Sequence, residues 1–514
     1  MARFTSCLFV TVFVCMGLLA GEGNSQDKRV PSSAALTQII DDRINAGLQA
    51  AAIAKSDVAT DAEFIRRVHL DLHGAVPTVE RVRSFLDDNA ADKRATLIDQ
   101  LLSSPQFSAH LADLWDDYLI PAADDPRLTK DRLNVWLKDA FETKSWDRIT
   151  HDLLTASGQR DKDAVVTYLL KGRETLTPAE LTDLVSQYFL GIRLNCAQCH
   201  DHPFTHWKQN DYWGLASFFT QIQYTDKRLQ KSGQIRDNPS IDIAKLENAD
   251  KLRRPKFLLG EELASDSKTP HRVALANWLV SPENPYFARA MANRIWWQLF
   301  GRGLVEPVDD MHSNNPVTHP QLLADLTEHF AASGFDLRHL SRAICNSAAY
   351  QRTSMPNSGN ERDTTLYSHM AVKVLTPEQL YDSLQIVAPP SSDRKGGQRK
   401  NDPRGEFVQF FRSEGDPRPT AYDRGIPQTL RMMNSPRILS PRDEAAAVRR
   451  MIEPGATSAQ AFKALYLHVL SRAPTDEERK ILGDFLERHP GSAEQAYAEI
   501  LWGLLNSSEF SLNH

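Results

Sequence analysis

Helical periodicity is the feature that most constrains this chain. Apolar residues recur at intervals of three and four, as in Phe64, Val68 and Leu72. This spacing places apolar side chains along one face of an α-helix, whereas a strand would require strict alternation. The pattern extends over residues 34–220 and returns over residues 268–512. We therefore expect a mostly α fold in which amphipathic helices pack on one another.

The length of the chain predicts more than one domain, because 514 residues exceed what one hydrophobic core usually organises. We expect one helical domain over residues 34–220 and a second over residues 268–512. Between them, residues 221–267 are polar and irregular, and Ile222-Gln223-Tyr224 alternates in the manner of a strand. This segment is predicted to be a linker with room for a small β-hairpin.

The N-terminus has the order of a secretory signal peptide, which we assign to residues 1–25. Arg3 precedes an apolar run over residues 7–19, and small and polar residues follow it. The run is shorter than the roughly 20 residues that a spanning helix needs, although a retained membrane anchor is the alternative. We expect cleavage between Ala20 and Gln26, export to the periplasm or cell surface, and no transmembrane segment in the mature chain.

Charge and cysteine content exclude two classes of protein. A formal net charge of -6 lacks the basic surface that nucleic-acid backbones select, so we expect no nucleic-acid partner. Signal removal leaves Cys196, Cys199 and Cys345, which are too few for a disulfide scaffold. Cys345 stands where related phrases of this chain carry apolar residues, so we expect it to be a buried packing residue.

The run Cys196-Ala197-Gln198-Cys199-His200 carries the most specific chemistry in the sequence. In a Cys-x-x-Cys-His motif two thiols bind the haem covalently and the adjacent imidazole binds the iron, which predicts one haem c. A zinc site made of Cys196, Cys199, His200 and His202 is the alternative, although structural zinc sites usually split their ligands into two separated pairs. A small disulfide or two free packing thiols is the third interpretation.

Two further roles around this motif remain open at the level of sequence. Asp201 can accept a hydrogen bond from the ligating imidazole or cap the following turn, and capping is the commoner role. A sixth iron ligand is not specified, and the sequence offers several histidines and methionines: His69, His73, Met291, Met311 and His312.

An acidic group, Glu306, Asp309 and Asp310, follows a glycine-rich turn. Neighbouring carboxylates can bind calcium or perform acid/base chemistry. More often such residues cap helices or pair with arginine, here with Arg294 or Arg302. We favour the structural role.

One phrase recurs at the two ends of the chain, as LLSSPQF at residues 101–107 and LLNSSEF at residues 504–510. In both copies an apolar pair ends a helix, a serine caps the next turn and the aromatic residue packs back. We therefore expect Phe107 and Phe510 to be buried in equivalent ways.

Several longer phrases resemble a secreted planctomycete family of two consecutive domains. The first half resembles domain of unknown function 1549, described as cytochrome-like, through FIRRVHLDLHG at 64–74 and CAQCHDHPF at 196–204. The second half resembles domain of unknown function 1553 through NPYFAR at 284–289, NRIW at 293–296, FGRGLVEPVDD at 300–310 and LNSSEF at 505–510. The resemblance implies export, a pair of helical domains, and an association with haem or with carbohydrate-rich surroundings, but no particular reaction.

These observations lead to three hypotheses of different classes. The first is an exported cytochrome c-like protein with one covalent haem, which transfers electrons to an unidentified redox partner or performs other redox chemistry. The alternative is a non-enzymatic binding or structural protein of the periplasm or cell surface, in which the Cys-His loop is a zinc site or a disulfide staple. The third is a hydrolase that acts on surface polysaccharide through the acidic group. Whether the protein is an enzyme stays open.

Overall fold

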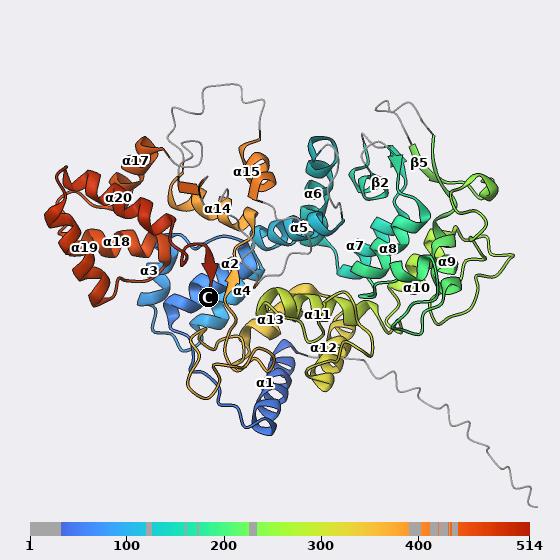
Figure 1. The fold of residues 1–514 in the computed structure, drawn as a ribbon, viewed down its shortest axis with the longest axis horizontal. Helices are drawn as coiled ribbons and strands as arrows, with labels where there is room; N and C mark the ends of the chain where they lie inside the picture. Colours follow the sequence, from blue (N-terminus) through green and yellow to red (C-terminus); the bar gives the residue numbers. More distant parts are fainter. Residues whose placement is uncertain are drawn as a thin grey trace, which may run out of the picture.

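A computed structural model gives the fold of the chain (Figure 1). It describes residues 32–119, 126–159, 162–171, 174–225, 234–389, 402–411, 420, 430, 432–433 and 440–514. The predicted signal peptide lies outside these residues.

Helices dominate the described part of the chain, which confirms the predicted fold class. The helices of the first half are α1 (Ser33–Ala50), α2 (Asp61–His73), α3 (Val79–Asp87), α4 (Lys93–Leu102), α5 (Pro105–Leu119), α6 (Pro126–Thr143), α7 (Trp146–Thr155), α8 (Pro178–Tyr188) and α9 (Gln209–Ala216). Those of the second half are α10 (His271–Leu279), α11 (Phe287–Phe300), α12 (Pro320–Ala332), α13 (Leu337–Asn346), α14 (Pro377–Val387), α15 (Pro403–Phe411), α17 (Pro441–Met451), α18 (Ser458–Leu470), α19 (Asp476–Arg488) and α20 (Ala493–Leu505). Short 3-10 turns form η1 (Ala164–Leu169), η2 (Asn195–Gln198), η3 (Ser217–Phe219) and η4 (Ile243–Lys245).

Local capping chemistry explains where several helices begin. The side chain of Thr177 accepts a hydrogen bond from the backbone N–H of Glu180, whose carboxylate accepts one from the N–H of Thr177 in return. Thr376 and Gln379 make the same reciprocal pair at the start of α14, and proline is the first residue of both helices. Such pairs satisfy N–H groups that have no partner within the helix.

The strands are short and lie in small antiparallel sheets. They are β1 (Gly158–Gln159), β2 (Leu170–Lys171), β3 (Glu174–Thr175), β4 (Ile222–Tyr224), β5 (Gln234–Asp237), β6 (Lys373–Val374) and β7 (Leu512–Asn513). Strand β4 pairs with β5, with Ile222 opposite Asp237, so the predicted small β-hairpin is present. Strand β1 adds to the other edge of β5, while β2 pairs with β3 and β6 with β7.

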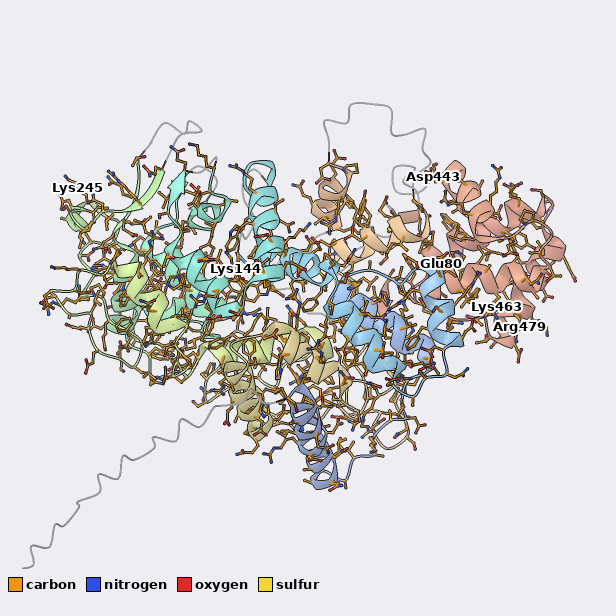
Figure 2. All side chains as sticks on the ribbon, turned by 180° about the vertical axis from the view of Figure 1, so that it is seen from behind. Glu80, Lys144, Lys245, Asp443, Lys463 and Arg479 are labelled. Carbon is orange, nitrogen blue, oxygen red and sulfur yellow. The ribbon has the colours of Figure 1, made fainter. Side chains whose placement is uncertain are left out.

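Two clusters of buried apolar residues form the interior. The larger draws almost entirely on residues 36–370, and so on both expected helical domains. The smaller combines residues 375–510 with Leu70 and Val76. Helices α17 to α20 lie at one end of the elongated molecule and α8 to α10 at the other (Figure 1). Lys245 and Arg479 mark the same two ends from behind (Figure 2). The domain boundaries drawn from the sequence stay a prediction, since apolar packing continues across residues 221–267.

The recurring phrase behaves as predicted. Phe107 is 2% exposed and Phe510 is fully buried. An arginine lies over each ring, with Arg338 at 5.5 Å from the centroid of Phe107 and Arg66 at 5.9 Å from that of Phe510. Cys345 is fully buried, as expected of a packing residue, and burial raises the pKa of its thiol.

Two fully buried arginines of α2 bind carbonyl groups of distant segments. Arg66 donates to the carbonyl oxygens of Val469 and Phe510, at 3.1 and 3.0 Å. Arg67 donates to those of Tyr350 and Arg352, both at 2.8 Å. A buried guanidinium requires such acceptors, because leaving its N–H groups unpaired would cost several kcal/mol. Helix α2 therefore ties the N-terminal half of the chain to its C-terminal segment.

Asp71, on the same helix, completes this buried polar network. Its carboxylate accepts hydrogen bonds from the Lys373 ammonium at 2.5 Å, the Asn513 amide at 2.7 Å and the Tyr350 hydroxyl at 2.8 Å. Lys373 also donates to the carbonyl oxygen of Leu299, at 2.7 Å, near the end of α11. One carboxylate thus connects α2, α11 and the β6–β7 pair.

Candidate functional site

The Cys-x-x-Cys-His motif forms a compact turn between α8 and α9. Its first residues lie in η2, where Ala197 is buried and anchors the turn to the core. Cys196 and Cys199 are free thiols, and both are exposed, as is His200. The predicted site therefore presents its two thiols and its imidazole on the surface of the molecule.

Side chains of α9 hold this turn in place. The Gln209 amide donates to the carbonyl oxygens of Cys199 and Gln198, at 2.9 and 3.1 Å. The indole N–H of Trp213 donates to the Gln198 carbonyl oxygen as well, at 3.0 Å. Gln209 and Trp213 are four residues apart and so share one face of α9. The backbone of the motif is consequently fixed at two successive carbonyls.

His200 is oriented by the backbone of its neighbour. Its Nδ1 atom lies 2.7 Å from the carbonyl oxygen of Asp201, and the Nε2 atom has no hydrogen-bond partner among the described residues. The Asp201 carboxylate accepts from the backbone N–H of Gln209 at 3.0 Å and pairs with Lys208 at 3.1 Å. The hydrogen bond from Gln209 lowers the pKa of Asp201. The Asp201 carboxylate therefore binds the start of α9 instead of the turn that directly follows it, and the backbone carbonyl of Asp201, not its side chain, positions the imidazole.

The residues after the motif form a folded loop beside it. The backbone N–H of His202 donates to the Trp207 carbonyl oxygen at 2.9 Å, and His202 Nδ1 accepts from the backbone N–H of Phe204 at 3.2 Å. Partial burial lowers the pKa of His202. The ring of Phe204 is 68% exposed and provides an apolar surface in this loop.

The acidic group of the second half lies against the motif-bearing segment. Asp309 accepts two hydrogen bonds from the Arg193 guanidinium, at 2.8 and 3.1 Å, and a third from the amide of Gln187. The predicted pairing with arginine is found, but its partner is Arg193. The guanidinium of Arg294 instead lies over aromatic rings, 4.9 Å from the centroid of Tyr118.

The other two carboxylates of the group face different partners. Glu306 accepts from the backbone N–H of Gly303 at 2.6 Å, and Asp310 lies 3.5 Å from His312. The amide of Asn314 donates to the carbonyl oxygen of Phe204 at 3.1 Å, which joins this loop to the motif loop. Asp309, through Arg193, and the neighbouring Asn314, through Phe204, therefore join the two halves of the chain, whereas Glu306 and Asp310 contact residues of the second half.

The candidate sixth ligands are placed very differently. His69 and His73 belong to α2, which lies away from the α8–α9 end of the molecule (Figure 1). Met291 is buried within α11. The backbone N–H of Met311 donates to the Gly191 carbonyl oxygen at 2.8 Å, while His312 acts electrostatically on His202. Only the last two are brought near the motif.

Both ring nitrogens of His312 already have partners. Its Nδ1 accepts from the backbone N–H of Asn314 at 3.1 Å, and its Nε2 lies 3.0 Å from the amide nitrogen of Asn315. The structure therefore assigns no sixth ligand.

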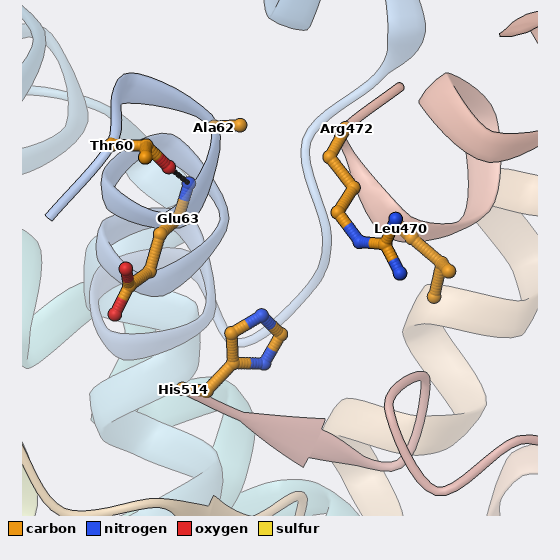
Figure 3. A pocket seen from close by; sticks show the side chains of 6 residues that line it. All are labelled: Thr60, Ala62, Glu63, Leu470, Arg472 and His514. Carbon is orange, nitrogen blue, oxygen red and sulfur yellow. Dashed lines mark hydrogen bonds between the residues drawn. The ribbon is translucent and has the colours of Figure 1, made fainter. Parts of the chain in front are cut away.

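A small pocket of about 180 Å³ lies elsewhere, between the start of α2 and the end of α18 (Figure 3). Its Arg472 is bound by the carboxylates of Glu478 and Glu509, at 2.8 and 2.7 Å. Its Glu63 accepts from Arg67 at 2.6 Å. The charges of this pocket thus compensate one another within the protein, and the exposed motif remains the candidate site.

A hydrogen-bonded pair that joins α8 to α9 was not foreseen from the sequence. Asp183 of α8 accepts a hydrogen bond from the hydroxyl of Tyr212 at 3.2 Å, and burial raises the pKa of this carboxyl to about 6. The positioning roles of Gln209 and Trp213 were not foreseen either. The spacing of four residues between Gln209 and Trp213 was the available signal, but it does not reveal how α9 is oriented relative to the motif.

The described residues contain no group of three or more His, Cys, Asp or Glu side chains arranged to bind a metal ion. None of their helices combines the length and the apolar character that crossing a membrane requires.

Two family models match the chain in succession. PSCyt2, a protein of unknown function (DUF1549), matches residues 39–224. PSD1, a protein of unknown function (DUF1553), matches residues 271–426. Neither the curated proteins nor the solved structures contain a match.

Proposed function

We propose that this chain, which belongs to the two-domain family with a PSCyt2 domain followed by a PSD1 domain, is an exported cytochrome c-like protein with one covalent haem. Both domains are of unknown function, so the proposal rests on the chemistry of the Cys196–Ala197–Gln198–Cys199–His200 turn. In it, Cys196 and Cys199 form the thioether bonds and His200 is the proximal ligand.

The orientation of His200 is the observation that carries the proposal. Histidines that bind a metal usually donate the N–H of the other ring nitrogen to a carboxylate or a backbone carbonyl, which fixes the tautomer and raises ligand basicity. His200 has this arrangement, because Nδ1 lies 2.7 Å from the Asp201 carbonyl oxygen. A proton on Nδ1 leaves the lone pair on Nε2 available for iron.

The two thiols fit the same purpose. Both are exposed and unpaired on one short turn, so both are accessible to the vinyl groups that must react with them. Haem attachment also needs a backbone that keeps the thiols and the imidazole in a fixed relation. Gln209 and Trp213 supply this by binding the carbonyls of Gln198 and Cys199.

A bound haem supplies reversible one-electron chemistry at its iron. The protein places its attachment residues at the surface rather than in a buried chamber, which favours electron exchange with a redox partner over chemistry on an enclosed substrate. The exposed ring of Phe204 offers an apolar contact for the macrocycle or the partner.

Zinc is the alternative occupant, with Cys196, Cys199, His200 and His202 as ligands. The role of His202 Nδ1 as acceptor from the N–H of Phe204 leaves only its Nε2 for such a site. A disulfide staple in a binding or structural protein would use the thiols alone. Hydrolysis of polysaccharide by Glu306, Asp309 and Asp310 has less support, since Asp309 is engaged by Arg193.

Co-expression with a cytochrome c maturation system in the periplasm tests the proposal. We expect a red protein whose haem stays attached after denaturation, with single attachment in Cys199→Ala and an altered spectrum in His200→Ala. A matched control is Cys345→Ala, which removes a buried thiol outside the motif. Colourless protein with stoichiometric zinc would establish the zinc alternative. Colourless, metal-free protein would instead support a binding or structural protein without a cofactor.

Export is tested by N-terminal sequencing of the secreted protein. We expect the mature chain to begin between Ala20 and Gln26, because small residues there follow the apolar run directly. Secreted protein that still begins at Met1 would remove the signal-peptide assignment.

A further inference from the structure

Resting on the haem attachment proposed above, we infer that Asp183 is a proton-uptake site coupled to the oxidation state of the iron at the Cys196–His200 turn. Such a site would make electron transfer by this protein dependent on pH. It is distinct from the residues that attach the haem.

Asp183 has an unusual environment for a carboxylate. It is half-buried on α8, and its hydrogen-bond partner from the facing helix is the hydroxyl of Tyr212, at 3.2 Å. No lysine, arginine or histidine pairs with it among the described residues. That hydroxyl is shared, because it also lies 3.2 Å from the Ala179 carbonyl oxygen. The negative charge is therefore poorly compensated.

The neighbouring charged groups act in the same direction. Glu180, on the same helix, raises the pKa of Asp183, as burial does more strongly, while the hydrogen bond from Tyr212 lowers it. Helix α9 contributes Tyr212, and η3, which also packs on α8, contributes only serine and phenylalanine. The resulting pKa of about 6 lies where small changes in nearby charge alter protonation.

Helix α9 connects this carboxyl to the motif. Gln209, Tyr212 and Trp213 occupy adjacent positions on its surface. Gln209 and Trp213 bind the carbonyls of the Cys196–His200 turn, whereas Tyr212 binds Asp183. Burial raises the pKa of Tyr212 most, the neighbouring Asp183 carboxyl adds to this, and the Cys199 thiol contributes least. The helix that supports the motif through Gln209 and Trp213 therefore also donates to Asp183 through Tyr212.

With a haem bound at the turn, one electron from an external one-electron donor would reduce the iron and remove one positive charge from the site. The ionised Asp183 carboxylate then binds one proton from solvent, which restores the local charge. Oxidation reverses both changes. Ionised Asp183 stabilises the oxidised iron, so the midpoint potential falls as pH rises through the pKa of this carboxyl.

Spectroscopic redox titration of the haem-bearing full chain between pH 5 and pH 8 tests the inference. In the wild type we expect the potential to fall by the equivalent of roughly a tenfold shift in the reduction equilibrium, about 59 mV for one electron. Asp183→Asn should keep the higher potential throughout. The control Asp484→Asn, an exposed carboxylate on α19 at the far end of the molecule, should behave as wild type.

Tyr212→Phe provides a second, independent measurement. Loss of the hydroxyl removes the hydrogen bond that lowers the pKa of Asp183, so the pH-dependent region should move to higher pH. A haem-bearing wild type whose potential does not change over this range, or changes equally in Asp183→Asn, would overturn this inference alone. Protein that attaches no haem would overturn both this inference and the proposed function.

Discussion

Helix α2 and the Cys196–His200 turn, two segments that carry the family resemblance, hold their polar groups in opposite environments. On α2, Arg66 and Arg67 are fully buried, and Asp71 joins them inside the molecule. At the turn, the thiols and the imidazole are exposed. The buried groups bind hydrogen-bond partners on distant segments, donors for Asp71 and carbonyl acceptors for the arginines, whereas the exposed groups leave their reactive atoms free.

This difference separates a structural role from a chemical one. A buried charge is tolerated only where hydrogen bonds compensate its loss of water, so α2 is committed to joining segments. An exposed thiol contributes little to packing and needs a chemical reason. Substitutions in the first region should therefore affect stability, and substitutions in the second should affect cofactor content.

The largest effect is expected for Asp71→Ala. This change leaves the buried Lys373 without its carboxylate and takes an acceptor from Tyr350 and Asn513. Loss of one partner from a buried ion pair costs about 3–5 kcal/mol in the free energy of unfolding, and the two further lost hydrogen bonds add to this. Urea unfolding followed by circular dichroism measures it. The exposed Cys196→Ser should unfold as wild type, and equal effects of the two changes would remove the distinction between the regions.

A somewhat smaller effect is expected for Phe510→Ala. The ring is fully buried, and its loss should cost about 3–5 kcal/mol through lost apolar contacts and the cavity that remains. Phe107→Ala, in the other copy of the phrase, should cost a similar amount. Calorimetry of both variants tests whether the two copies of the phrase are equivalent. A negligible loss of stability in either variant would contradict this equivalence.

Stability should also fall in acid, because α2 packs near neutral buried histidines. Burial lowers the pKa of His110 to about 4, whereas an unfolded histidine titrates near 6.5. Between pH 6.5 and pH 4 the unfolded state therefore binds more protons than the folded state. The free energy of unfolding consequently decreases as the pH falls through this range. The expected slope approaches about 1.4 kcal/mol per pH unit for this group. His110→Gln should flatten the profile of stability against pH, and an unchanged profile would contradict the assignment.

The smallest effect on stability is expected for Gln209→Ala. This change removes two hydrogen bonds to the motif turn, worth about 1–2 kcal/mol together. Its main effect should be a lower yield of covalent haem, since the turn loses part of its support. Asn210→Ala, the exposed neighbour, is the matched control. A full haem yield in Gln209→Ala would show that α9 does not position the motif.

The sequence predicted the helical class, the small hairpin and the burial of Phe107, Phe510 and Cys345, because periodicity and capping are local signals. It did not reveal that Asp309 pairs with Arg193, since this contact joins residues 116 positions apart and depends on how the helices pack.

The candidate site was foreseen only in part. The tight spacing of its cysteines and histidine was readable from sequence. Its exposure and the supports from Gln209 and Trp213 depend on the direction in which α9 leaves the loop. The compensation of Arg66 by carbonyls more than 400 residues away has no sequence signature at all.

The intact mass of the denatured protein, after periplasmic co-expression with a cytochrome c maturation system, tests the central claim most directly. Covalent attachment at Cys196 and Cys199 predicts that the mature chain carries the added mass of one haem. A mass equal to that of the unmodified mature chain, under conditions in which a control cytochrome c is fully matured, would contradict it.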